Sequence, residues 1–181
     1  MVAGIDIYTV GHSTRSQDQL LEILRAAGIG AVADVRSFPS SRRHPQFNRG
    51  ALEQWLPEAG IDYLHFGELG GRRNPVPGSP NDGWRERGFR GYADHMASSE
   101  FEAGIERLEQ LARTKPTAVM CAEALWWRCH RRLIADVLTL GGWDVRHLGS
   151  GAPISHELTP FAEVRERGAL IYPPPQTSFE V

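Results

Sequence analysis

Two short segments hold the residue types that perform nucleophilic and acid–base chemistry. They are Cys121-Ala122-Glu123 and Cys129-His130-Arg131. A thiolate is a strong nucleophile, and a helix N-terminus or nearby cations lower the pKa of a thiol. A carboxylate or an imidazole can carry the proton. The sequence therefore predicts a reactive thiol at Cys121 or Cys129, with Glu123 or a histidine as proton carrier. Alternatively, Cys129 fits a small core residue.

The spacing of these segments departs from two known schemes. A thiol phosphatase needs five residues between its Cys and its Arg, whereas Arg128 comes one residue late after Cys121. A zinc deaminase follows a Cys-Ala-Glu type of segment with a pair of cysteines, and here only Cys129 follows. No cofactor is predicted, and zinc held by Cys121, Cys129, His12 and His130 is the alternative. Against it, neighbouring residues on a helix, such as Cys129 and His130, point in different directions.

Further polar residues follow other apolar runs of the chain. Gly11-His12-Ser13 comes after the first run, where backbone N–H groups before a helix can bind an anion. Asp34 and Arg36 come after the second and could serve the site or form an internal ion pair. The predicted catalytic residues are Cys121, Glu123 and His12, and the predicted anion-binding residues are Gly11, Ser13, Asp34, Arg36, Ser41, Arg42, His130 and Arg131.

Strands and helices are predicted to alternate along the chain. Short apolar runs predict strands over 5–10, 31–35, 61–66, 117–121 and 143–148. Helical spacing and capping residues predict helices over 16–27, 49–59, 89–96, 99–115, 126–140 and 159–167. This order predicts a single α/β domain over 1–171, with a mainly parallel sheet of about five strands, helices on both faces and an extended tail over 172–181. Ligands bind beyond the carboxyl ends of parallel strands, where the polar residues named above lie.

The composition of the chain restricts the classes of binding partner that we expect. It has 181 residues, a net charge of −2 and a pI near 6.4, so its overall field does not favour nucleic acid or anionic membranes. No apolar run reaches the roughly 18 residues of a membrane span. With two cysteines and no signal-peptide pattern, the chain is expected in the cytoplasm. The basic stretch from Arg36 to Arg49 keeps a nucleic-acid partner as an alternative.

Over residues 6 to 150 the chain resembles the uncharacterised DUF488 family. The resemblance rests on Thr9-Val10-Gly11-His12-Ser13, Asp34-Val35-Arg36 with Pro39 and Ser41, Leu69-Gly70-Gly71, Phe89 and Tyr92, and the two cysteine segments. It implies an α/β architecture and singles out the same residues, and it implies no reaction.

Three functions remain open at this point. The first is an enzyme, a hydrolase or a transferase, that acts on a small anionic or nucleotide-like substrate. The second is a non-catalytic nucleotide or nucleic-acid binding module. The third is a metal-binding protein that uses Cys121, Cys129 and histidine. The sequence also leaves open whether the long irregular stretch from Glu68 to Gly83 is an ordered lid.

Overall fold

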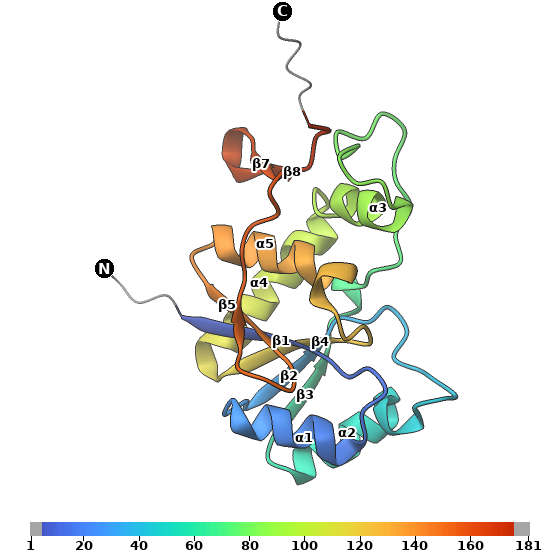
Figure 1. Ribbon diagram of the computed structural model, residues 1–181, viewed down its shortest axis with the longest axis vertical. Coiled ribbons are helices and arrows are strands. Elements are labelled where there is room, and N and C mark those ends of the chain that lie inside the picture. The colour runs from blue at the N-terminus through green and yellow to red at the C-terminus, as the bar shows by residue number, and fades with distance from the viewer. Residues whose placement is uncertain (1–4, 176–181) are drawn as a thin grey trace, which may run out of the picture.

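A computed structural model describes residues 5–175 and contains an open six-stranded sheet (Figure 1). The strand order is β3-β2-β4-β1-β5-β6, and all neighbours are parallel except the last pair. The predicted parallel α/β fold is therefore confirmed, with one short antiparallel strand added at an edge. The strands are β1 (Asp6–Gly11), β2 (Ala31–Asp34), β3 (Asp62–His65), β4 (Thr117–Cys121), β5 (Asp144–Leu148) and β6 (Ile154–Ser155).

Helices cover both faces of the sheet, as predicted, and each face has its own apolar core. One core holds Leu20 and Leu24 of α1 (Gln17–Ala26) with Leu52 and Leu56 of α2 (Arg49–Glu58). The other core contains apolar residues of the remaining helices, which lie on the opposite face of the sheet (Figure 1). Those helices are α3 (Arg87–His95), α4 (Ser99–Thr114) and α5 (Arg131–Leu140).

The register of the central strands brings the predicted polar segments to one edge. β4 lies between β2 and β1, and its five residues are all buried, as an apolar strand in a parallel sheet should be. Gly11 pairs with Cys121, and Asp34 pairs with Met120. The His12 N–H then donates to the Cys121 carbonyl at 2.9 Å, which continues the ladder past the end of β1. Three strands thus end side by side.

Two predicted helices differ from the structure. The predicted helix 126–140 is a short 3-10 helix, η3 (Trp126–Arg128), followed by α5, and Cys129 between them has an extended backbone. The predicted helix 159–167 is replaced by a small antiparallel pair, β7 (Glu163–Val164) and β8 (Leu170–Ile171), which enclose another 3-10 helix. Helical spacing without an apolar face to bury did not suffice to form a helix here.

The long irregular stretch is held in place by one half-buried carboxylate. Asp94 of α3 accepts hydrogen bonds from the Val76 N–H, the Ser79 hydroxyl and the Asn81 amide. Tyr172, which was assigned to the tail, is fully buried, and residues 176–181 of that tail lie outside the described residues. Among residues 5–175, no helix has the length and apolar content needed to cross a bilayer.

Candidate functional site

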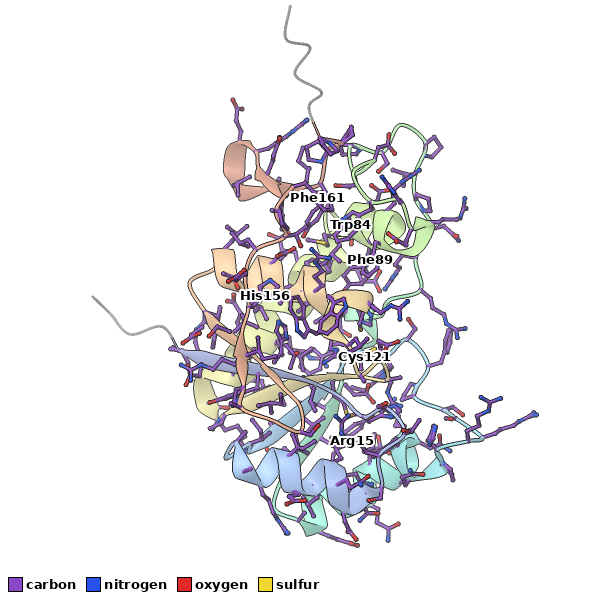
Figure 2. All side chains as sticks on the ribbon, viewed as in Figure 1. Arg15, Trp84, Phe89, Cys121, His156 and Phe161 are labelled. Carbon is purple, nitrogen blue, oxygen red and sulfur yellow. The ribbon has the colours of Figure 1, made fainter. Side chains whose placement is uncertain are left out.

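A cavity of about 790 Å³ opens at the carboxyl edge of the sheet. Cys121, at the end of β4, and Phe89, from α3, both contribute to its wall (Figure 2). The predicted catalytic residues Cys121, Glu123 and His12 all line the cavity. Among the predicted anion-binding residues, Ser13, Arg36, Ser41 and His130 line it as well.

Two thiols and one imidazole meet in this cavity, and we call them the thiol–imidazole cluster. The Cys121 Sγ, the Cys129 Sγ and the His130 Nδ1 all lie within 4.8 Å of one another. The His130 Nδ1 is 3.9 Å from the Cys121 sulfur and 3.5 Å from the Cys129 sulfur. On the other side of the ring, the Nε2 is 2.9 Å from the Val35 carbonyl oxygen, which can only accept a hydrogen bond. The Nε2 therefore carries a proton, and in the neutral ring the Nδ1 directs its lone pair at the two sulfurs.

The two thiols differ in acidity because they interact with each other. The pKa of Cys129 is held well below the usual thiol value by a hydrogen bond from Cys121, and the positive charge of Arg131 adds to the effect. The same hydrogen bond, together with burial, raises the pKa of Cys121. Cys129 is thus the more acidic thiol. It was expected to be a small core residue, and it is buried, yet its sulfur belongs to the cluster and lines the cavity.

The expectation that Cys129 and His130 point in different directions is wrong. That expectation treated both residues as part of a continuous helix. In the structure Cys129 has φ −130° and ψ 151°, and His130 is the N-cap of α5. An extended residue followed by a helix cap can turn both side chains to the same side. The zinc arrangement that included His12 also changes, because His12 does not belong to the cluster.

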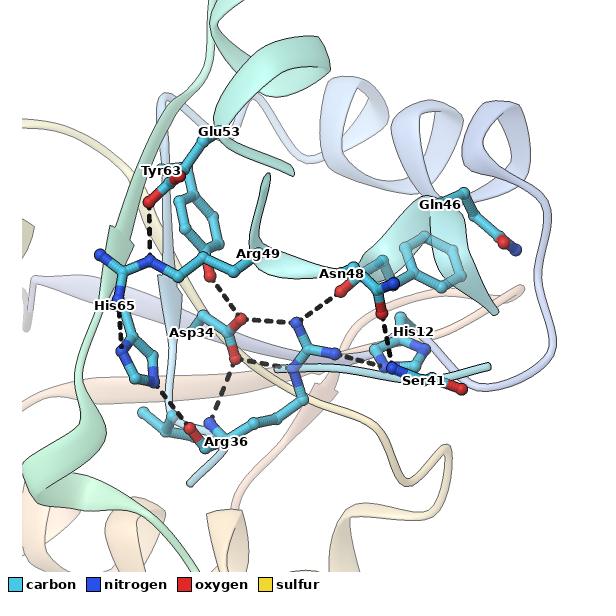
Figure 3. A network of polar contacts seen from close by, with 12 residues as sticks. His12, Asp34, Arg36, Ser41, Gln46, Asn48, Arg49, Glu53, Tyr63 and His65 are labelled. Carbon is cyan, nitrogen blue, oxygen red and sulfur yellow. Dashed lines mark hydrogen bonds and ion pairs between the residues drawn. The ribbon is translucent and has the colours of Figure 1, made fainter. Parts of the chain in front are cut away.

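Asp34 and Arg36 form an ion pair with each other beside the cavity (Figure 3). The Arg36 Nε and Nη2 donate to the two carboxylate oxygens of Asp34 at 2.8 and 2.6 Å, and Tyr63 donates to the same carboxylate at 2.7 Å. The Nη2 also donates to the Phe47 carbonyl, and the Nη1 lies 3.1 Å from the His12 Nε2. At most one of the five N–H groups of Arg36 remains for a ligand.

His12 supports Arg36 in its position. Its Nδ1 donates to the Ser13 carbonyl at 2.9 Å, so its Nε2 carries the lone pair that accepts from Arg36. Burial lowers the pKa of His12 to about 4, and the ring stacks on Phe47 with centroids 4.4 Å apart. At neutral pH His12 is therefore uncharged, and its only lone pair is occupied.

Arg131 is buried and does not line the cavity, and it has no carboxylate partner within the described range 5–175. A chain of hydrogen bonds runs from its Nη1 to Thr9 (3.3 Å), on to His147 (2.7 Å) and His156 (3.0 Å), and ends on the carboxylate of Asp136 (2.9 Å). Burial lowers the pKa of His147 to about 3, so this ring is neutral in the chain. The chain links a buried cation to a buried anion on the same helix.

Arg131 also holds the loop that follows Cys121. Its Nη2 donates to the backbone carbonyls of Glu123 and Ala124. Gly11 packs closely against the same loop, since an added Cβ there would lie 1.9 Å from the Glu123 carbonyl oxygen. Gly11 and Arg131 therefore shape the cavity without lining it. Asp34 and Arg42 do not line it either, since Asp34 is fully buried behind Arg36 and Arg42 points to solvent.

Several residues of the cavity wall were not among the predicted site residues. Arg72 and Arg128 line it, and neither guanidinium has an ion-pair partner among residues 5–175. Phe38 and Phe89 add apolar surface, and Arg72 lies over the Phe38 ring at 5.6 Å. Arg72 follows the Gly70-Gly71 turn, and that turn was the available signal. The buried Asp136 was also missed, although an acid between Ala135 and Val137 in an apolar helix indicates a specific partner.

The comparison with protein families assigns the chain to a family. The model described as "Domain of unknown function DUF488" matches residues 16–138. The chain belongs to the DUF488 family. The matched range contains the Asp34–Arg36 pair and the whole thiol–imidazole cluster, while Gly11-His12-Ser13 precedes it. No match was found among curated proteins or among solved structures. The DUF488 description names no reaction, so the chemistry has to be argued from the cavity.

Proposed function

We propose that this DUF488 protein is an enzyme, a hydrolase or a transferase, that acts on a small anionic or nucleotide-like substrate in the cavity. The observation that carries the proposal is the thiol–imidazole cluster in a cavity that Arg72 and Arg128 also line. Reactive groups and anion-binding groups thus face the same space. A volume of about 790 Å³ lies within the range of small-molecule sites.

Arg72 and Arg128 are the residues best suited to bind the anion. A guanidinium binds phosphate or carboxylate through two parallel hydrogen bonds, provided that its N–H groups are free. Arg36 fails this condition because Asp34, Phe47 and His12 occupy its donors. We therefore assign anion binding to Arg72 and Arg128, and we assign Arg36 to the framework of the cavity.

The reacting group lies in the cluster. A thiolate at Cys129 would attack the substrate directly, and a zinc ion held by the cluster would instead supply a bound water. Glu123 lines the same cavity and is exposed, so it can carry a proton between the reacting groups and solvent. His12 is a positioning residue for Arg36, because its lone pair is not available to a substrate.

Nucleic acid is the second candidate ligand. Arg42 and Arg43 are exposed and have no ion-pair partner within residues 5–175. Binding through such arginines to a phosphate backbone weakens steeply as salt rises. The overall charge of −2 gives no long-range attraction, so the cavity remains the better-supported site.

The test measures binding and turnover separately. Ligand-detected NMR is run with inorganic phosphate, adenosine monophosphate and a single-stranded oligonucleotide, and conversion of a nucleotide mixture is followed by mass spectrometry. We expect the Arg72→Gln/Arg128→Gln double variant to weaken small-anion binding at least tenfold, while Arg25→Gln on α1 serves as the matched control. We expect Cys129→Ser to abolish conversion and to retain binding. Unchanged binding in the double variant, or full conversion by Cys129→Ser, would contradict the proposal.

A further inference from the structure

The three atoms of the thiol–imidazole cluster have the spacing of a metal-ligand set. Zinc bonds of about 2.3 Å to sulfur and about 2.0 Å to nitrogen, arranged as a tetrahedron, place ligand sulfur and nitrogen about 3.5 Å apart. The His130 Nδ1 lies 3.5 Å from the Cys129 sulfur and 3.9 Å from the Cys121 sulfur. A tetrahedron also places two sulfurs about 3.8 Å apart, and the two sulfurs here lie within 4.8 Å. Shifts of a few tenths of an ångström bring the first two distances to those values.

The groups around the cluster orient its atoms for this role. The His130 Nε2–H donates to the Val35 carbonyl, which fixes the ring with its Nδ1 lone pair toward the sulfurs. Metal-binding histidines usually donate their other ring N–H to a carbonyl or carboxylate in this way. The hydrogen bond of His130 to Val35 is thus compatible with an ion bound between the Nδ1 and the two sulfurs.

Gly71 keeps space open beside the imidazole nitrogen. A Cβ at this position would lie 2.5 Å from the His130 Nδ1. Gly71 is not among the glycines with positive φ, so its backbone does not require glycine. The close approach to His130 is the reason that a side chain cannot be accommodated. Gly71 and all three ligand residues line the cavity, which leaves one side of the cluster open.

We propose that Cys121, Cys129 and His130 bind one zinc ion and leave its fourth position open to the cavity. Structural zinc sites have four protein ligands, whereas catalytic sites have three and a water. Two thiolates balance the charge of the ion, so the buried site carries no net charge. This inference deepens the proposed function, because the bound water would be the reacting group at the bottom of the cavity.

The chemistry that the ion would supply is hydrolytic. A zinc ion held by Cys121, Cys129 and His130 would lower the pKa of its bound water to near 7 and so supply a nucleophile at neutral pH. Glu123, which lines the same cavity, would accept a proton from that water and pass it to the leaving group. The water oxygen would replace the leaving group on the electrophilic atom of the substrate, so the reaction would be a hydrolysis that needs no further reactant.

Zinc binding is measured on the full, reduced, metal-free chain by competition with a chromogenic chelator. We expect one zinc ion per chain, with the affinity reduced at least 100-fold in Cys129→Ser and in His130→Ala. His44→Ala is the matched control, because His44 lines the cavity without belonging to the cluster, and its zinc affinity should equal that of the wild type. Gly71→Ala should weaken zinc binding, and Gly149→Ala, where an added Cβ meets nothing within 4 Å, should not.

Cobalt(II) gives a second readout that does not depend on activity. The cobalt-loaded wild type should show thiolate-to-cobalt charge-transfer bands and the intense visible bands of tetrahedral coordination. Both should disappear in the two ligand variants, and circular dichroism shows whether those variants fold. Zinc binding that is absent, or that is equal in wild type and folded ligand variants, would overturn the proposal. If zinc fails to bind but anion binding and conversion persist, only the metal inference falls, and Cys129 acts as a thiolate.

Discussion

The Asp34–Arg36 pair and the thiol–imidazole cluster lie at the same edge of the sheet, and they differ in how fully their polar atoms are used. Asp34 accepts from Arg36 and Tyr63, and Arg36 also engages Phe47 and His12. In the cluster, the two sulfurs are the only hydrogen-bond partners of the His130 Nδ1 among residues 5–175. A saturated network holds a structure in place, whereas a group with unused lone pairs can bind or react. The comparison indicates which of two equally polar regions is the framework and which is the site.

The largest expected effect concerns the framework. Asp34→Asn leaves the buried Arg36 guanidinium without its counter-charge, and we expect a loss of about 3–5 kcal/mol in the free energy of unfolding. Urea denaturation measures it. Glu53→Gln, which breaks the exposed Arg49–Glu53 pair, is the control and should cost less than about 1 kcal/mol. Equal effects of the two variants would remove the distinction between a framework pair and a surface pair.

The framework should also lose stability in acid. Folding lowers the pKa of His12 to about 4, from about 6.5 in the unfolded chain. The unfolded state therefore binds a proton first, and the contribution of His12, complete above pH 6.5, is lost as the pH falls toward 4. At about 1.4 kcal/mol for each pKa unit, the loss reaches about 2–3 kcal/mol at pH 4.

Urea denaturation at a series of pH values tests this contribution. His12→Gln cannot titrate, so the difference between its curve and that of the wild type isolates His12 from the exposed carboxylates. Parallel curves between pH 6.5 and pH 4 would show that His12 is not held neutral by the fold.

A third prediction concerns the loop that carries the cluster. Gly11→Ala places a Cβ 1.9 Å from the Glu123 carbonyl oxygen, so the loop after Cys121 must move. We expect a loss of about 1–3 kcal/mol in the free energy of unfolding, together with weaker zinc binding. Gly50→Ala in the first turn of α2 meets nothing within 4 Å and should be neutral or slightly stabilising. Wild-type zinc affinity in Gly11→Ala would mean that the loop does not depend on this contact.

The smallest expected effect is a difference in reactivity between the two thiols of the cluster. In the metal-free protein the hydrogen bond from Cys121 keeps the pKa of Cys129 low, so Cys129 should react with iodoacetamide at pH 7 before Cys121 does. We expect a rate difference of more than threefold, read by mass spectrometry of the alkylated peptides. Cys121→Ser retains a hydrogen-bond donor, and Cys129 should stay reactive in it. Faster alkylation of Cys121 would reverse the assignment of the acidic thiol.

The sequence does not show which hydrogen-bond donors and acceptors are already occupied in the folded protein. The strand–helix order predicted the parallel sheet, and the residues after each strand predicted the edge at which the cavity lies. Arg36 was predicted to bind an anion, with an internal ion pair to Asp34 as the alternative, and the structure shows the ion pair. Arg72 was not among the predicted site residues, because it reaches the cavity from a loop in which its backbone N–H donates to the hydroxyl of the distant Ser37.

The sequence by itself determined the α/β architecture, the DUF488 family and the segments that meet at the carboxyl edge, since these depend on local apolar periodicity and on short motifs. Only the tertiary structure decided which of those segments form the framework and which form the site. The side chains of Cys129 and His130 converge because α5 begins only at Arg131. His130 is its N-cap, and Cys129 before it has an extended backbone. His130 directs its Nδ1 at the sulfurs because the Val35 carbonyl, 95 residues earlier in the chain, holds its Nε2. Contacts between residues far apart in the chain set the direction of the His130 Nδ1 lone pair, and such contacts cannot be predicted from the local sequence.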